Sequence, residues 1–209
     1  MSITASDKGG SDFELPPAGN HVARCVRIID LGTTEQEYMG SYSSKRQVFL
    51  AFELPTKMHT YTTKEGEEKT EPFLATAFYT LSLNEKANLC ILLEGWRGKA
   101  FTEEEKEGFD ISILAGLSCL LNVIPYTSQT GKKRIRLAAS QLPEGMECPP
   151  QVNPTIVFSL EDFDQSVFDN LTDGLKKMVM QSDEYKVMTG QVGQRQEVPP
   201  ADDLDDIPF

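Results

Sequence analysis

The sequence predicts a mainly β domain, followed by a helical segment and a disordered acidic tail. Five segments between residues 19 and 142 have strand-like composition, and the main helix pattern of this range lies between the third and the fourth. After Pro143 the chain is rich in proline, and apolar residues then recur at spacings of three and four. We therefore divide the chain into a flexible N-terminal segment (1–18), a β domain (19–142), a linker with an amphipathic helical segment (143–188) and a tail (189–209).

Charge and composition exclude several classes of protein. The net charge is −12, but residues 143–209 hold 4 Lys+Arg against 14 Asp+Glu, whereas residues 1–142 hold 16 against 18. The β domain is thus nearly neutral, and local basic clusters in it can still bind nucleic acid. No apolar stretch approaches the ~18 residues of a membrane span, and the N-terminus lacks a signal-peptide pattern. We therefore expect no membrane contact. Four scattered cysteines without a Cys-x-x-Cys motif predict a protein of the reducing cytoplasm without a structural zinc site, and we expect no metal or cofactor.

Strand signals alternate with turn signals through the β domain. The five strands are expected at residues 20–31, 46–54, 73–83, 117–126 and 134–142. Polar, turn-rich segments at 32–44, 55–72 and 127–133 are expected to connect them.

The second strand alternates between two sets of side chains. Its core-facing set is Val48, Leu50, Phe52 and Leu54, which leaves Phe49 on the outer face.

The helical insert between the third and fourth strands has its own start and stop signals. Ser82 and Glu85 have the spacing of a capping box, with Asn84 as the alternative cap, and Gly95 is expected to end the helix. Thr102 and Glu105 predict a second, short helix. Five strands with a helix between the third and fourth is the element order of an OB-fold, a five-stranded Greek-key barrel with an oligonucleotide-binding face.

Apolar residues in the C-terminal segment repeat at helical spacing. They are Leu160, Phe163, Val167, Leu171, Leu175 and Met178. This pattern predicts an amphipathic helix that packs on the barrel, divided in two if Thr172-Asp173-Gly174 interrupts it. The alternative is a contact between protomers, which would support self-association along DNA.

Binding of single strands requires cations for the phosphates and flat rings for the bases. The body offers candidates of both kinds in its strands and loops. These DNA-binding candidates are Arg24, Arg27, Lys45, Arg46, Phe49, Lys57, Tyr61, Tyr79, Trp96, Arg97, Lys99, Tyr126, Lys132, Lys133, Arg134 and Arg136. The hairpin cluster from Lys132 to Arg136 is the strongest basic patch, because it has no acidic neighbours.

Several of these candidates have a structural alternative. Phe49, Tyr79 and Trp96 are either stacking platforms or core residues. Arg24 and Arg27 lie on opposite faces of one strand, so at most one of them lines a groove.

The final residues have the chemistry of a peptide that a partner protein binds. Four carboxylates, at Asp202, Asp203, Asp205 and Asp206, precede Ile207-Pro208-Phe209. Pro208 favours an extended end, the ring and Ile207 fit a small apolar pocket, and the carboxylates match a basic rim. The alternative is an acidic tail that only confers solubility.

Taken together, these segments resemble phage-type single-stranded DNA-binding proteins over residues 15–209. The resemblance rests on Pro17-Ala18-Gly19, Arg46 to Leu54, Thr130-Gly131-Lys132-Lys133, Phe163 to Val179 and, most specifically, Asp205-Asp206-Ile207-Pro208-Phe209. It implies sequence-independent, non-catalytic coating of single-stranded DNA in phage replication and recombination, with replication or recombination proteins bound at the tip.

Other functions compete with this one. An enzyme is disfavoured because no phosphate loop, paired histidines or activated nucleophile is visible. An acidic scaffold or DNA mimic fits the net charge but not the basic hairpin. A protein that also binds duplex DNA stays open, because phosphate contacts discriminate poorly between the two forms.

Overall fold

A computed structural model of the chain describes residues 14–38, 41–63, 66–128 and 131–191. The strands are β1 (Gly19–Tyr38), β2 (Ser41–Thr62), β3 (Glu68–Thr80), β4 (Ser118–Thr127), β5 (Lys133–Ser140) and β6 (Ile156–Phe158). The helices are α1 (Asn88–Arg97), α2 (Glu103–Glu107), a 3₁₀ turn (Ile111–Leu114), α3 (Gln165–Asp169), α4 (Asp173–Gln181) and α5 (Asp183–Met188). The protein is mainly β, with the expected helical insert between β3 and β4.

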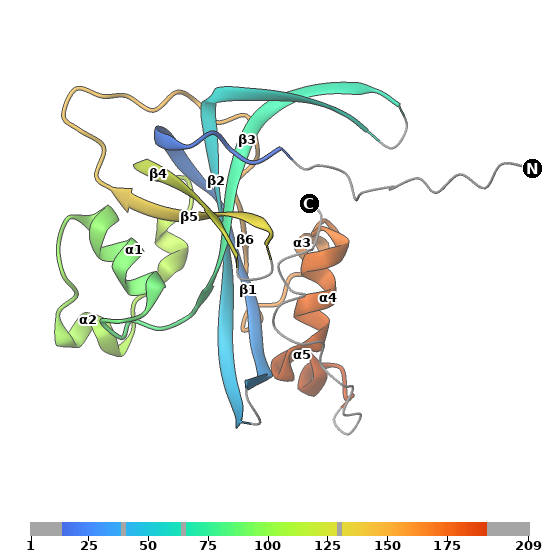
Figure 1. Cartoon of the computed structure of the whole chain (residues 1–209). Helices are drawn as coiled ribbons and strands as arrows, with labels where there is room; N and C mark the ends of the chain where they lie inside the picture. Colours follow the sequence, from blue (N-terminus) through green and yellow to red (C-terminus); the bar gives the residue numbers. More distant parts are fainter. Residues whose placement is uncertain (1–13, 39–40, 64–65, 129–130, 192–209) are drawn as a thin grey trace, which may run out of the picture.

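The first five strands form one strongly curled antiparallel sheet, a half-barrel (Figure 1). Its order is β3-β2-β1-β4-β5. On one side β1 pairs with β4 only as far as Arg24, which stands opposite Ser118. Beyond this point β1 pairs in parallel with β6, from Arg27 to Ile29. The sequence pattern did not predict this short strand.

The two hairpins that include β2 are longer than the sequence pattern predicts. The turn-rich segment 32–44 is mostly strand, because β1 and β2 stay paired out to Tyr38 and Ser41. The connection 55–72 is also mostly strand: after a bulge beyond Leu54, β2 and β3 continue as a two-stranded ribbon, residues 58–62 with 68–72. We call this ribbon the arm. Both of its faces carry polar side chains, so it lacks the apolar alternation by which strands are recognised in a sequence.

Hydrophobic residues pack against both faces of the sheet. The inner cluster contains Val48, Leu50, Phe52 and Leu54, as predicted, and it is covered by α1. The outer cluster lies over β1 and β2, where helices α3–α5 cover it. Figure 1 shows α1 and α2 on one side of the sheet and α3–α5 on the other.

The cap of α1 differs from the prediction, whereas that of α2 agrees with it. The backbone N–H groups of Asn84 and Lys86 donate to the side chains of Ser82 and Asn84 in a turn that precedes the helix, so neither residue caps it. The helix ends at Arg97 rather than at Gly95, because Gly98 adopts the left-handed conformation (φ 69°) that closes it. The predicted capping box of Thr102 and Glu105 is present at the start of α2.

The C-terminal segment forms three short helices rather than one or two, and it packs on the sheet. Leu175, Met178 and Val179 are buried against β1 and β2. The Glu184 carboxylate accepts hydrogen bonds from the Thr33 amide and hydroxyl, both at 2.7 Å. Because its apolar face is buried within its own chain, the alternative of a protomer contact through residues 160–179 is wrong for that face.

Candidate nucleic-acid interface

The outer face of the ribbon formed by β4 and β5 combines a ring with two guanidinium groups. Inward-facing Cys119, Leu121 and Val123 are buried in the core, so the alternating residues of β4 face outward. Tyr126 is one of these, and Arg134 stands directly opposite it on β5. The Arg136 guanidinium carbon lies 4.6 Å from the centroid of the Tyr126 ring.

The β4–β5 hairpin contains four cationic side chains and no carboxylate. Residues 111–142 contain no Asp or Glu, whereas they contain Lys132, Lys133, Arg134 and Arg136. The turn places Lys132 and Lys133, both exposed, at the tip of the hairpin. Gly131 has a φ of 83°, and its amide donates to the Ser128 carbonyl at 2.9 Å, which closes the turn. A phosphate chain that passes along the ribbon would meet cations without a nearby carboxylate from the same strands.

Sequence reasoning missed one member of this face. Ile124 is 43 % exposed and stands opposite Arg136. The strict alternation with buried Cys119, Leu121 and Val123 is the signal that would have identified it. An exposed isoleucine beside the half-buried Tyr126 ring extends the apolar surface on which bases could lie.

Two further DNA-binding candidates, Lys57 and Tyr61, lie at the end of the sheet from which the β4–β5 hairpin extends. The pairing of β2 with β1 stops at Glu53, next to the start of β1, and β4 runs past that start toward Thr127. The arm and the β4–β5 hairpin therefore extend from the same end of the sheet. Lys57, at the base of the arm, and Tyr61 are both exposed.

Aromatic rings stack along one face of the arm. The His59 ring stacks on Phe73, with centroids 4.5 Å apart, and on Tyr61 at 5.4 Å. The Tyr61 hydroxyl donates to Glu71 at 3.0 Å. Desolvation, followed by this contact with a carboxylate, raises the pKa of Tyr61. The arm thus contributes rings, but Glu68 and Glu71 offset the charge of Lys69, its one lysine.

Three predicted stacking rings are buried, so that prediction was wrong for them. Phe49 is 0 % exposed and packs against Phe78, with centroids 5.2 Å apart, because α3–α5 cover the face on which it lies. Tyr79 belongs to the inner core, and burial raises its pKa. Trp96 packs on Phe52, and its indole Nε1 donates to the Ser118 carbonyl at 2.9 Å. A buried ring cannot stack on a base.

Three predicted cations are bound within the protein. Arg24 donates to the Gly116 carbonyl at 2.6 Å. Arg46 forms ion pairs with Asp30 at 2.6 Å and Glu161 at 3.0 Å. Arg97 forms an ion pair with Glu105 and lies over the Phe101 ring, with the guanidinium carbon 4.2 Å from the centroid. These three guanidinium groups therefore have partners within the fold, and a contact of any of them with phosphate stays a prediction.

The remaining cations lie apart from the hairpin or are half-buried. Lys45 stands opposite Thr34, toward the far end of β1. The Lys99 ammonium lies 3.8 Å from Glu105. Arg27 is half-buried, and desolvation lowers its pKa, although the nearby Glu71 acts in the opposite direction. The structure does not bring these three residues together with the β4–β5 face.

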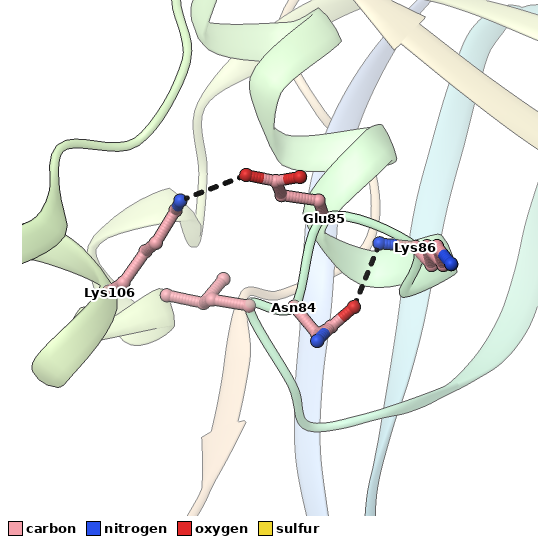
Figure 2. Close-up of a pocket in the computed structure, with 5 residues that line it drawn as sticks. Asn84, Glu85, Lys86 and Lys106 are labelled. Carbon is pink, nitrogen blue, oxygen red and sulfur yellow. Dashed lines mark hydrogen bonds and ion pairs between the residues drawn. The ribbon is translucent and has the colours of Figure 1, made fainter.

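A shallow hollow of about 340 Å³ lies beside the start of α1 (Figure 2). It is lined by Leu83, Asn84, Glu85, Lys86 and Lys106. The Lys106 ammonium lies 2.9 Å from Glu103 and 3.5 Å from Glu85. Because carboxylates offset the positive charge of Lys106, and no lining residue is aromatic, the hollow is a weaker nucleic-acid candidate than the β4–β5 face.

The predicted partner-binding residues, Asp202, Asp203, Asp205, Asp206, Ile207, Pro208 and Phe209, lie outside the described residues. Within the described ranges, no three His, Cys, Asp or Glu side chains are grouped so that they could hold a metal ion. None of the helices in this part of the chain is long and apolar enough to cross a membrane. No protein-family model matches the chain, and no curated protein matches it either.

Proposed function

We propose that this protein binds single-stranded DNA without sequence preference and without catalysis, and that the strand lies across the outer face of β4 and β5. The observation that carries the proposal is the placement of Arg136 over the Tyr126 ring, with Arg134 opposite, on a sheet face that α3–α5 leave uncovered. Rings supply base stacking, and guanidinium groups supply phosphate contacts and cation–π interactions. Neither contact depends on the identity of the base.

The chemistry of this face favours single strands over duplexes. In a duplex the faces of the bases are stacked on one another, so a ring on a protein surface cannot reach them. Tyr126 and Ile124 offer flat or apolar surface, which only an unstacked base can use. The cations alone would bind both forms of DNA through their phosphates.

The strand order supports an OB-fold. A Greek-key barrel of this class, opened between β3 and β5, would have the order β3-β2-β1-β4-β5 with a helical insert before β4. This chain has the same order and the same insert. OB-folds use the face of strands 2 and 3 for oligonucleotides. In this chain helices α3–α5 cover the outer cluster on that face, which leaves the β4–β5 part as the binding surface.

A coating role in phage replication or recombination, with partners recruited through residues 202–209, completes the proposal. It rests on the resemblance of the sequence and on the chemistry of the acidic Ile-Pro-Phe segment.

The test is fluorescence anisotropy of labelled oligo-dT and of a matched duplex, at two salt concentrations. Full-length protein is compared with a variant that ends at residue 200. We expect salt-sensitive preference for oligo-dT that survives the truncation or becomes stronger, because an acidic segment competes with DNA for cations. Equal affinity for the duplex would show a general DNA-binding protein, and absence of binding by both forms would favour a scaffold or a DNA mimic.

A further inference from the structure

The arm of β2 and β3 extends from the sheet as a two-stranded ribbon (Figure 1). On the body of the sheet β2 lies between β1 and β3, but its pairing with β1 ends at Glu53. From Met58 to Thr62 its only strand partner among the described residues is β3. The backbone groups on the other edge of this segment are thus available to another strand.

The two edges of the arm differ in how well they are protected against pairing. The β3 edge carries Glu68 and Glu71, and Pro72 has no amide to donate. Charged side chains and proline are the features by which edge strands avoid association. On the β2 edge, Pro55 and Lys57 lie before the free segment, whereas residues 58–62 contain no proline, lysine, arginine or carboxylate. Thr60 and Tyr61 also favour strand structure. Met58 and Tyr61 are 50 % and 39 % exposed there.

We propose that the β2 edge of the arm pairs with the same edge of a second copy of this chain, in antiparallel orientation. The free segment runs from Met58 to Thr62, so full overlap places its midpoint, Thr60, on the twofold axis. Met58 then stands opposite Thr62 of the other copy, and His59 stands opposite Tyr61. No like charges meet, and an aromatic pair is among the favourable cross-strand contacts.

The symmetry of this contact limits the size of the assembly. An interface that uses the same edge on both copies is isologous, so it closes as a dimer and does not propagate into a fibre. Five residues a side make a small interface, and we therefore expect a weak dimer that dissociates on dilution. The contact forms without DNA, so its test does not depend on the proposed function.

The first experiment places a cysteine on the twofold axis. Thr60→Cys is made in a Cys148→Ser background, because the other three native cysteines are buried. The matched control is Thr70→Cys, since Thr70 lies opposite Thr60 in the same ribbon, with hydroxyl oxygens 2.8 Å apart, but on the β3 edge. Oxidation with copper phenanthroline, followed by non-reducing electrophoresis, should give at least tenfold more covalent dimer for Thr60→Cys. Equal yields, or no dimer in either variant, would overturn the proposal.

The second experiment measures self-association without a cross-link. Met58→Glu with Thr62→Glu places two carboxylates opposite one another at both ends of the interface, and it should weaken dimerisation at least tenfold in sedimentation velocity runs. The control Lys69→Gln with Thr70→Glu makes the same change in net charge on the β3 edge and should leave the dimer intact. A wild-type protein that stays monomeric at 100-fold the concentration used for binding assays would refute the contact.

Discussion

The outer face of the sheet consists of two halves with different chemistry. Over β1 and β2 it is apolar and covered: Phe49, Ile29 and Leu31 are buried under α3–α5. Over β4 and β5 it carries Tyr126 and Arg136, which no described helix covers. One curled sheet therefore has a half covered by helices and a half that we propose binds DNA. Whether an aromatic ring on this sheet is a core residue or a stacking platform depends on whether a helix covers it.

A buried glutamate on β2 holds the linker against the covered half of the sheet. Glu53 is 0 % exposed, and its oxygens accept hydrogen bonds from the amides of Val152 and Asn153 at 2.8 and 2.7 Å. These bonds hold the linker against β2 before it reaches β6 and the helices.

The largest effect is expected from reversing the four cations of the hairpin. Changing Lys132, Lys133, Arg134 and Arg136 to Glu should weaken oligo-dT binding at least 100-fold. Each phosphate contact on a single strand contributes ~0.7 to the slope of log K against log salt, so the slope should fall by about 3. Anisotropy titrations across a salt series measure both quantities.

A matched control tests the assignment of the other lysines. The same number of charges is reversed at exposed sites away from the hairpin, namely Lys45, Lys86, Lys99 and Lys177. Binding should then change by less than about threefold, since exposed charges beyond a Debye length of ~8 Å interact weakly. If the control loses as much affinity as the hairpin variant, the effect reports net charge, and the site is not on β4–β5.

The covered half can be tested at Gly32. Its φ is 72°, and an added Cβ would lie 2.5 Å from the Ser182 Cβ and 2.6 Å from Leu160. Gly32→Ala should therefore destabilise the fold by about 2–4 kcal/mol, from the strained backbone and the displaced helices. Urea unfolding measures this change.

The matched control for Gly32 is Gly131→Ala. Gly131 also has a positive φ, of 83°, but nothing lies within 4 Å of its added Cβ. Only the backbone penalty of roughly 1 kcal/mol should remain. Equal losses at both glycines would mean that α3–α5 do not pack against Gly32 in solution.

The contribution of the ring should be smaller than that of the cations. Base stacking is worth about 1–3 kcal/mol per aromatic residue when it is replaced by alanine, so Tyr126→Ala should weaken oligo-dT binding by about tenfold. Tyr126→Phe should keep most of the affinity. Tyr42 is 72 % exposed but lies toward the opposite end of the sheet, so Tyr42→Ala should have no effect. Quenching of tyrosine fluorescence by oligo-dT offers a second readout, and a loss in Tyr42→Ala equal to that in Tyr126→Ala would contradict the site.

The contrast between the two halves also explains which features were predictable from sequence. Val48, Leu50 and Phe52 follow a period of two, and Thr102 with Glu105 has a local capping pattern, so both predictions were confirmed. Phe49 follows the same period, but the sequence around it gives no sign that a segment more than a hundred residues away covers its face of the strand. Arg46 likewise reads as a free cation until the fold brings Glu161 to 3.0 Å from it.

Prediction was weakest where strands lack an apolar face. The arm pairs Thr60 with Thr70 and Tyr61 with Lys69, and alternation of polar with polar residues gives no signal. The hairpin of β4 and β5 is the opposite case. Its buried alternation on one face and its glycine turn are both visible in the sequence, and its cations were therefore placed on the correct element.

The smallest expected effect concerns the pH dependence of the covered half. Burial acts to raise the pKa of Glu184, but the two hydrogen bonds from Thr33 outweigh it, and the pKa is lowered overall. A carboxyl whose pKa is depressed in the folded state stabilises the fold above its unfolded pKa, near 4.3, and loses that contribution as the pH falls through the folded value. Replacing Glu184 by Gln should therefore reduce the free energy of unfolding by about 1 kcal/mol at pH 7 and flatten its decline below pH 5, without a change in oligo-dT affinity. Urea unfolding between pH 3 and pH 7 gives both quantities. A Glu184→Gln variant with an unchanged pH profile would mean that Thr33 does not hold this carboxylate, and a loss of DNA binding at unchanged stability would mean that the covered half takes part in the interface.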